Sequence, residues 1–579
     1  MTQLGARWAG LAVVFAILWA MVASLALIAL LGMWQALEIL PPYYVPLQWF
    51  LIGWHYFDYY RVPQSLLISA GGASALITTL AWRSHQILKP KLPLHGETRW
   101  LTRQEGEADG LVWSKAPPGD AIVLGRDGKH IVSLPGEDHV ALYARTGAGK
   151  GVGFVVPNCQ NWGGSLVCFS VKRDVAQAAA AERQRLGDEV YLFDLMSHDG
   201  RTHRWNPLGQ VRRGTPEAFN DIQKAMFRLV PETKAQNPFW DNAGRRLAGA
   251  AALLLAETPG APLTVQAVRR LLARPDWAEN LQAMLQRARE EGRPYPASAV
   301  DTIRAIIRRK EDESAASVIE TTTTALSLWE IPRVAAGTAE SDFDLGAIRS
   351  CKMSIFVVAS PDDIRRLRTI YQMFFSQFVA ANTQQEFGED PAHRYRVLVM
   401  LDEFWALGEV SVLADAVAFT RSYGFRLAYV IQSKNQTITS FGKEGSKNLF
   451  LNTGAELLYG GCDIEVAEEV SKRMGFDTVE EVTRNRPRYL AWFQSNKQTE
   501  SEAMRRRALM LPQEISRMSR NQVVVLRPGI MPLKMQRIRW FEDRWFQDRG
   551  GPMPLWPGLD VEVERESGCP GKAAAGRGF

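Results

Sequence analysis

Cysteine and histidine are scarce in this chain, and neither type is grouped as metal or disulfide sites require. The 579 residues include eight histidines and five cysteines, and no two cysteines have the C-x-x-C spacing. This argues against a zinc module and against a disulfide-stapled secreted domain. We expect buried free thiols in a reduced, cytoplasmic body. The cysteines are Cys159, Cys168, Cys351, Cys462 and Cys569.

Charge is absent from two stretches near the amino terminus, residues 8–34 and 62–82. A helix needs roughly 20 apolar residues to cross a bilayer, so we predict two N-terminal transmembrane helices joined by an outer loop, 35–61. A cleaved signal peptide fits less well, because the first run is about twice the length of a signal core and a second span follows.

The charges that flank these spans predict their orientation. Arg7 precedes the first span, and Arg83, Lys89 and Lys91 follow the second, whereas the loop between them is rich in aromatic residues. The positive-inside rule then places both termini and the rest of the chain in the cytoplasm.

Excess charge of one sign is small, with a net charge of +6. A mildly basic chain fits a nucleic-acid or membrane-surface partner, although the evidence is weak by itself. Most basic clusters are solvated faces, but clusters that line a pore would contact phosphate backbones without reading sequence. Three such clusters are Arg304, Arg308, Arg309 and Lys310; Arg365, Arg366 and Arg368; and Arg505, Arg506 and Arg507.

Beyond the spans, apolar runs alternate with helical patterns, which predicts an α/β fold with a parallel sheet covered by helices. The region 214–325 instead contains only helical patterns separated by Pro and Gly, which predicts an inserted all-α domain. The predicted strands lie in 139–144, 164–171, 189–195, 354–360, 396–404, 426–432, 455–460 and 522–529. The predicted organisation is a membrane region at 1–92, an α/β domain in two parts at 93–213 and 326–558, the all-α domain at 214–325 and a disordered tail at 559–579.

The stretch HVALYARTGAGKGVGFVVPN, residues 139–158, differs at two positions from the phosphate-binding pattern G-x-x-x-x-G-K-S/T. Ala144 stands at the first glycine position, and Gly151 stands where a hydroxyl residue normally ligates Mg²⁺. A strand, this turn and a helix starting at Lys150 would direct backbone N–H groups at phosphate, although an ordinary glycine turn is the alternative. The predicted nucleotide-binding residues are Thr146, Gly147, Ala148, Gly149, Lys150, Gly151 and Val152.

A second apolar run, YRVLVMLDEF, ends in the carboxylates Asp402 and Glu403. In nucleoside triphosphatases the first carboxylate holds Mg²⁺ and the second polarises the attacking water. A buried strand that ends in exposed acids is common, but its combination with a glycine-rich loop strand is rare. Together they predict hydrolysis of ATP with Mg²⁺, with Lys150 on the β- and γ-phosphates and Asp402 on the metal.

Two further polar residues flank the strand predicted at 426–432. Gln432 follows it and is placed to sense the γ-phosphate or the attacking water, unless it is a simple polar cap. Arg421 precedes it and is a candidate arginine finger that acts on the nucleotide of a neighbouring subunit, unless it is an ordinary surface arginine.

The order of motifs resembles the TraG/TraD coupling proteins of type IV secretion systems, from residue 1 to about 546. The matching stretches are TGAGKGVGFVVPN, RWNPLG, NPFWDNAGRRL, LDEFWALG, TRSYGFRLAYVIQS, GGCDIEVAEEVSKRMG and LMLPQEISRMSRNQVVVLRPGIMPLKMQRIRWFED. Members of this family are membrane-anchored ATPases that deliver relaxase-bound DNA to the transfer channel.

The resemblance implies a RecA-like P-loop NTPase domain with an inserted all-α domain, assembled as hexamers around a central channel. It implies an inner-membrane location and, as partners, single-stranded DNA with relaxase and relaxosome proteins and the secretion channel. It assigns Lys150 to phosphate, Asp402 and Glu403 to Mg²⁺ and water, Arg421 to the finger and Gln432 to sensing. The glycine at 151 is a variation that the family shows.

One departure from the family concerns the second strand. Relatives often continue it with a D-P-K-G-E-like stretch, where this chain has SVKRD, so Ser170 and Arg173 put any role of that strand end in doubt.

The function predicted from the sequence is an ATP-driven motor that moves single-stranded DNA with its attached protein through the inner membrane. The alternative is a receptor that recruits protein effectors, in which ATP switches an assembly rather than powering a pump. A chromosome-segregating FtsK-type translocase fits less well, because such proteins generally have more spans and a separate DNA-reading domain.

Overall fold

The computed structural model divides into two compact units, Met1–Leu94 and His95–Phe579. It describes residues 98–231, 239–408, 417, 419–485 and 499–561, together with Trp19, Ala23 and Thr79. The predicted spans at 8–34 and 62–82, apart from these three positions, lie outside the described residues. Within the part of the chain that is described, no helix combines the length and the apolar character needed to span a bilayer.

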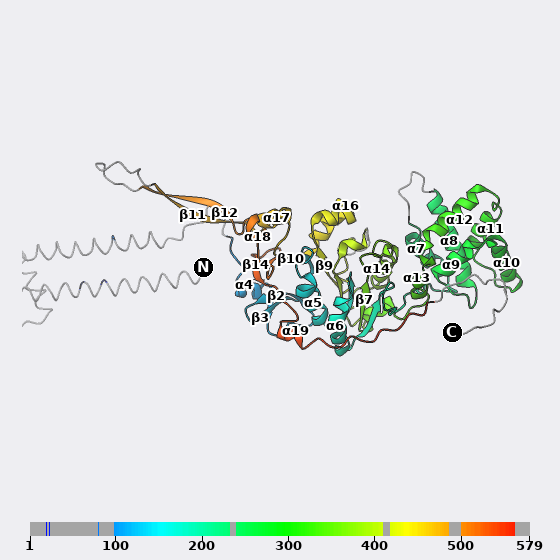
Figure 1. The fold of residues 1–579 in the computed structure, drawn as a ribbon, viewed down its shortest axis with the longest axis horizontal. Coiled ribbons are helices and arrows are strands. Elements are labelled where there is room, and N and C mark those ends of the chain that lie inside the picture. The colour runs from blue at the N-terminus through cyan, green and yellow to red at the C-terminus, as the bar shows by residue number, and fades with distance from the viewer. Residues whose placement is uncertain are drawn as a thin grey trace, which may run out of the picture. The chain divides into compact units, whose positions relative to one another are not determined.

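Twelve of the described strands form one large sheet, and seven of these run parallel to their neighbours (Figure 1). In sheet order the parallel strands are β10 (Thr453–Tyr459), β4 (His139–Tyr143), β9 (Phe425–Ile431), β8 (Val397–Leu401), β5 (Ser165–Ser170), β7 (Met353–Val358) and β6 (Glu189–Phe193). Each overlaps a strand predicted from the apolar runs, so that prediction is confirmed.

The rest of the sheet is antiparallel, so the predicted parallel sheet describes only part of it. The run predicted at 522–529 contains a strand that pairs antiparallel with β10 on one side and with its hairpin partner on the other. An apolar run has the same pattern in either direction, so the sequence did not distinguish the two. From β10 outward these strands are β13 (Gln522–Leu526), β14 (Leu533–Gln536), β2 (Ile122–Asp127), β3 (His130–Leu134) and β1 (Val112–Ser114).

Alternate residues of the central strands belong to two different cores, as the two-residue period of a strand requires. On β4, Val140 and Leu142 lie in one core, and Ala141 and Tyr143 lie in the other. The first core is covered by α5 (Val156–Asn161) and α6 (Asp174–Arg185), and the second by α14 (Arg368–Asn382).

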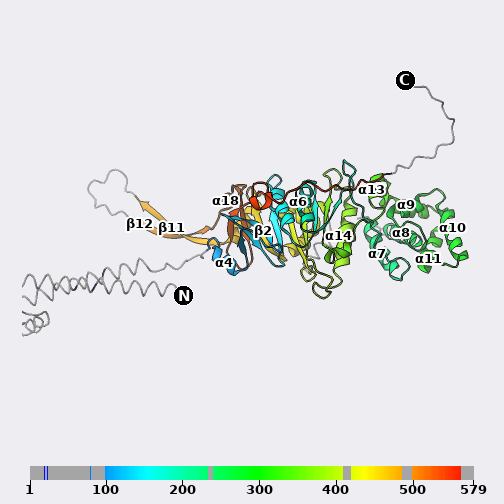
Figure 2. The same ribbon diagram turned by 90° about the horizontal axis from the view of Figure 1, so that it is seen from below.

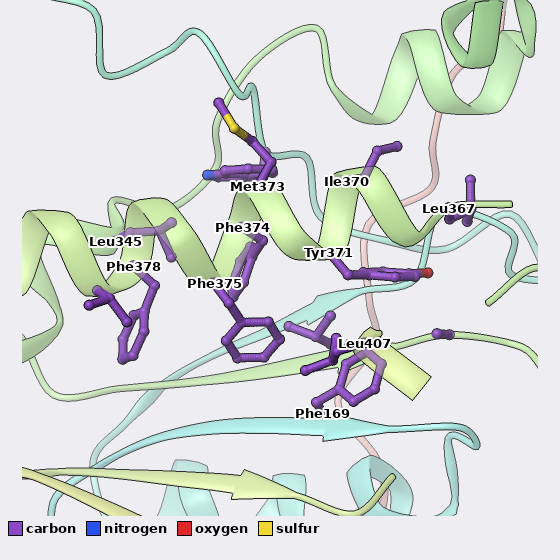
Figure 3. Close-up of a cluster of buried hydrophobic side chains, with 14 of the residues drawn as sticks. Phe169, Leu345, Leu367, Ile370, Tyr371, Met373, Phe374, Phe375, Phe378 and Leu407 are labelled. Carbon is purple, nitrogen blue, oxygen red and sulfur yellow. The ribbon is translucent and has the colours of Figure 1, made fainter. Parts of the chain in front are cut away.

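The face under α14 is held by aromatic contacts. Figure 3 shows Tyr371 and Phe375 of α14 directed at Phe169 of β5. The ring of Phe169 lies 5.6 Å from that of Tyr371 and 6.0 Å from that of Phe375, both edge-on, an arrangement that stabilises aromatic pairs. These contacts fix β5 against α14.

The described residues between β6 and the short helix η3 (Leu345–Arg349), just before β7, form helices without strands, at the β6–β7 end of the sheet (Figures 1 and 2). The 19-residue α8 lies at their centre, with residues on all sides of it buried. The described residues of 214–325 form helices, as the helical patterns predicted, and the helices continue to Gly337. Their standing as a domain with its own bounds stays a prediction. The helices are α7 (Glu217–Leu229), α8 (Phe239–Glu257), α9 (Val265–Ala273), α10 (Trp277–Glu290), α11 (Ala297–Ile307), α12 (Glu313–Ala325), η2 (Ser327–Glu330) and α13 (Pro332–Gly337).

One hairpin lies outside the large sheet and was not predicted. Its strands, β11 (Phe476–Asn485) and β12 (Thr499–Ala508), pair along their whole length but carry many charges, so neither gives an apolar run. The remaining described helices are α4 (Arg103–Ala108), η1 (Gly151–Val155), η4 (Phe404–Leu407), α16 (Lys434–Leu451), α17 (Ile464–Met474), α18 (Pro512–Ser516) and α19 (Arg544–Gln547).

Contacts of the folded unit reach the first residue of the predicted tail. The N–H of Leu559 donates to the carbonyl of Gly200 at 2.8 Å, and the Arg201 guanidinium donates to the carbonyl of Trp556 at 2.6 Å. The contacts of the folded unit therefore extend to residue 559, and residues 562–579 lie outside the described part.

Candidate nucleotide-binding site

The candidate residues gather at the carboxyl ends of four parallel strands, the edge where open α/β sheets bind ligands. In the register, Tyr143 of β4 lies opposite Ile431 of β9, Tyr429 of β9 lies opposite Leu401 of β8, and Phe169 of β5 lies opposite Leu401. The glycine-rich loop, Gln432 and the acids after β8 therefore emerge side by side.

The loop after β4 has the backbone of a phosphate-binding turn. Gly147 and Gly149 have φ of +77° and +78°, which glycine adopts without steric cost, as predicted. Ala144 needs no such freedom, because its N–H donates to the carbonyl of Ile431 at 3.0 Å and extends the β4–β9 ladder. The exchange of glycine for alanine at 144 is thus explained.

The helix begins at Lys150, as predicted, and its first turn, η1, is a π-helix. Lys150 Nζ forms an ion pair with Glu403, donates to the carbonyl of Asp402 at 3.1 Å and lies 3.5 Å from Asp402 Oδ1. All three side chains are largely buried, with exposed fractions of 13 to 16%. The structure thus brings together the lysine and both acids, which lie some 250 residues apart in the sequence.

The environment of Asp402 suits a cation. Burial raises the pKa of Asp402 to about 6, since the charge of Lys150 opposes the effect only in part and that of Glu403 adds to it. Asp402 Oδ1 is buried without a hydrogen-bond partner. A buried carboxylate oxygen with spare acceptor capacity, beside a loop for phosphate, fits Mg²⁺.

Gly151 lies in open space. A Cβ atom built there would have no heavy atom within 4 Å outside its own neighbourhood, so a serine or threonine would fit. Lack of space therefore does not explain why a glycine, without the hydroxyl that would ligate Mg²⁺, stands at this position.

Gln432 and Glu403 both follow strands of the sheet, and their predicted roles stay predictions. Gln432 follows β9, the strand that lies between the loop strand and the acid strand, and its N–H donates to Gln436 at 3.2 Å. Glu403 also accepts a 2.5 Å hydrogen bond from the indole N–H of Trp405, a residue that the sequence analysis missed. The signal was the run DEFW, in which the tryptophan comes two residues after the acid.

Arg421 lies at the amino ends of the parallel strands, whereas Lys150 lies at their carboxyl ends. Its guanidinium donates to the carbonyl of Asn452 at 2.6 Å and lies 3.3 Å from Asp138 Oδ1. Asn452 and Asp138 directly precede β10 and β4, so they mark the amino ends of the strands. Within one chain Arg421 does not reach the loop, and its predicted action on a neighbouring subunit stays a prediction.

The strand end after β5 is occupied by structural contacts. Ser170 Oγ donates to the carbonyl of Lys172 at 2.7 Å, and Arg173 pairs with Asp194 at 2.7 Å and with Asp199 at 2.9 Å. These residues therefore play no visible part at the loop, in line with the departure from the family pattern.

The thiol prediction was wrong at one position. Cys159, Cys168 and Cys462 are buried and free, but Cys351 is exposed, because it lies in the bend before β7. Cys569 lies outside the described residues.

The basic clusters lie on three separate elements. Arg304, Arg308, Arg309 and Lys310 are at the end of α11, Arg365, Arg366 and Arg368 are at the start of α14, and Arg505, Arg506 and Arg507 are on β12.

The family profile for Type IV secretory system Conjugative DNA transfer matches residues 97–555. The chain belongs to this family. The resemblance inferred from the motifs is confirmed, and the chain is a coupling protein of the TraG/VirD4 type.

Relatives and solved structures agree with the assignment. The conjugal transfer protein TraG of Escherichia coli is 30% identical over 508 residues, which cover 80% of this chain and 79% of TraG. Protein VirD4 of Rhizobium radiobacter is 28% identical over 424 residues, which cover 72% of this chain and 60% of VirD4.

Two structures of the plasmid coupling protein TrwB share the fold. The complex with the non-hydrolysable ATP analogue ADPNP has a TM-score of 0.55 at 17% identity, over 78% of this chain and 95% of TrwB. The complex with ADP and Mg²⁺ has a TM-score of 0.53 at 16% identity, over 82% and 97%. The predicted RecA-like α/β NTPase fold is confirmed.

Proposed function

We propose that this family member hydrolyses ATP with Mg²⁺ to recruit relaxase-bound single-stranded DNA and move it to the type IV secretion channel. The observation that carries the proposal is the cluster of Lys150, Asp402 and Glu403 beside the glycine-rich loop. The TrwB complexes with ADPNP and with ADP and Mg²⁺ support the choice of ligand.

The residues divide the work by position. Lys150 forms an ion pair with Glu403 in the structure. When ATP binds, the lysine ammonium group would leave Glu403 and contact the β- and γ-phosphates. Glu403, released from the lysine and held by Trp405, would then orient a water and accept its proton. Asp402 would hold Mg²⁺, which when bound would neutralise charge on the phosphate oxygens. Gln432, between loop and acids, would contact the γ-phosphate or the water.

The assembly we propose is a hexamer around a central channel. The position of Arg421 at the amino ends of the strands supports it. From there the side chain does not reach the nucleotide site of its own chain, so an arginine finger at this position would act on the site of a neighbouring chain. In a ring, each chain would complete the site of the next and stabilise the charge of the transition state.

We further propose an inner-membrane location with both termini and the catalytic body in the cytoplasm. This rests on the uncharged stretches 8–34 and 62–82 and on the basic residues that flank them.

ATPase measurements on the unit that begins at His95 test the proposal. Single-stranded DNA should stimulate hydrolysis, and the stimulation should weaken steeply with salt, because backbone contacts release counterions. DNA transfer in cells should fail with Lys150→Ala. Wild-type transfer by that variant would refute the motor.

The second candidate is a receptor for protein substrates, and the surface of the helical segment favours it. Phe219 and Phe227 of α7 are 43% and 56% exposed, and Phe219 borders a hollow of about 370 Å³ between α7, α8 and α11. Deleting residues 214–325 should then abolish relaxase binding and leave nucleotide binding measurable. Retained relaxase binding would contradict this role.

A further inference from the structure

Arg537 lies in the segment that follows β14 and runs beside the start of the loop helix. Its own N–H donates to the carbonyl of Asn521 at 2.7 Å, and the N–H of Trp540 donates to the carbonyl of Val152 at 3.4 Å. The segment is thus tied both to the sheet and to the first turn of the helix.

The side chain of Arg537 fills the space that two glycines of the loop leave free. A Cβ atom on Gly153 would lie 2.6 Å from Cγ and 2.7 Å from Cδ of Arg537, and one on Gly149 would lie 2.9 Å from Cζ. A side chain at 153 would meet the stem of this arginine and the Tyr459 hydroxyl, and one at 149 would meet its guanidinium and also strain the backbone, where φ is +78°. Gly151, between them, has open space.

The guanidinium of Arg537 is anchored on several sides. It donates to the carbonyl of Ala148, lies 5.8 Å from the centroid of the Tyr459 ring and approaches Asn521 Oδ1 to 3.5 Å. Burial lowers the pKa of Arg537 below that of a free arginine, but an arginine keeps its charge at neutral pH. A charged hydrogen-bond donor therefore holds the carbonyl of Ala148.

This contact fixes the direction of a loop amide. In a trans peptide the C=O and the following N–H point to opposite sides. Since Arg537 holds the carbonyl of Ala148, the N–H of Gly149 must point away from Arg537. Backbone N–H groups of such a loop are what hold phosphate oxygens.

We propose that Arg537 is a positioning residue that keeps the loop 147–153 in its phosphate-binding conformation. The inference rests on the proposed function, because it assumes that the loop binds nucleotide. It also makes the strand pair β13–β14, which carries Arg537 at its end, a support of the nucleotide site.

The test is nucleotide affinity, measured by calorimetric titration of the full chain with ADP and Mg²⁺. Arg537→Ala should weaken binding about tenfold or more, as expected for loss of a charge-assisted hydrogen bond, and Arg537→Lys should recover part of it. Gly153→Ala should produce a similar loss, because its methyl group displaces the arginine. The double variant should bind no more weakly than Arg537→Ala alone.

Arg539→Ala is the matched control, because the Arg539 side chain contacts Asn521 at 2.8 Å and Glu542 at 2.9 Å and forms no hydrogen bond with the described residues of the loop. It should bind ADP as the wild type does. Equal affinity of Arg537→Ala and wild type would overturn the inference, as would additive losses in the double variant. Failure of the wild type itself to bind ADP would instead refute the proposed function.

Discussion

At the scale of single residues, Gly151 and Gly153 show why one glycine can be replaced and another cannot. Both lie in the turn after Lys150, but a Cβ atom at 151 meets no neighbour, whereas one at 153 meets Arg537 and Tyr459. The sequence pattern GKGVG gives them equal weight. The packing of two residues far along the chain, Arg537 and Tyr459, distinguishes them.

Replacing Gly151 by serine should therefore leave the fold intact and add a hydroxyl where related loops ligate Mg²⁺. We expect the unfolding midpoint to stay within a few degrees and the affinity for Mg²⁺ in the presence of ADP to rise severalfold. A magnesium titration checks this. A Mg²⁺ affinity equal to that of the wild type would mean that another group already fills the coordination position.

His139, the first residue of β4, predicts an acid-sensitive fold. Its Nε2 lies 3.0 Å from the carbonyl of Val417 and its Nδ1 accepts from the N–H of Leu427 at 3.1 Å, which fits one neutral tautomer. Burial, aided by the charge of Arg421, lowers the pKa of His139 to about 3. Between about pH 6.5 and pH 3, His139 is therefore protonated in the unfolded chain, where its pKa is near 6.5, but stays neutral in the folded chain.

The free energy of unfolding should therefore fall as the pH drops from about 6.5 towards 3, by ~1.4 kcal/mol per unit and ~2 kcal/mol by pH 5 from this residue. Denaturant unfolding at several pH values measures it. His139→Gln should lose this component of the slope, and an unchanged slope would assign the sensitivity to other groups.

At the scale of elements, the sequence predicted best what depends on local pattern. The parallel strands, the helices α7 to α10 and the turn at Lys150 each follow from periodicity or from a motif. The direction of β13 was not predicted, because its partner β10 lies far along the chain, and the hairpin β11–β12 was missed because its charged strands give no apolar run. The contact of Arg537 with the loop was missed because almost 400 residues separate them, and that of Trp405 because the run DEFW does not show by itself which way the indole faces. Lys150 and the acids were found because their types and strand ends have a known chemistry.

The helix α14 packs aromatic side chains against β5, one of the strands that end at the site. Phe375 is fully buried against Phe169 (Figure 3), so Phe375→Ala should lower the free energy of unfolding by about 3–5 kcal/mol. Phe375→Leu should lose less, since most of the volume is kept. Thermal unfolding of both variants checks this, and equal stability of the alanine variant would place the support of β5 elsewhere.

At the scale of the whole molecule, Lys150 and Arg421 lie at opposite ends of the parallel strands, which predicts that two chains together complete one ATPase site. Lys150→Ala and Arg421→Ala should each lose ATPase activity, but a mixture should recover part of it. In mixed rings, the intact Arg421 of one variant can face the intact loop of the other. Activity of Arg421→Ala alone, or a mixture no more active than its components, would remove the finger role.

The most direct measurement of the central claim is steady-state ATP hydrolysis by the unit from His95, with and without single-stranded DNA, for the wild type and for Glu403→Gln. Our account predicts DNA-stimulated hydrolysis by the wild type. Glu403→Gln should still bind ATP but hydrolyse it at least about a hundredfold more slowly, because the group that accepts the proton of water is gone. Undiminished hydrolysis by Glu403→Gln, or a wild type that neither hydrolyses ATP nor responds to DNA, would contradict it.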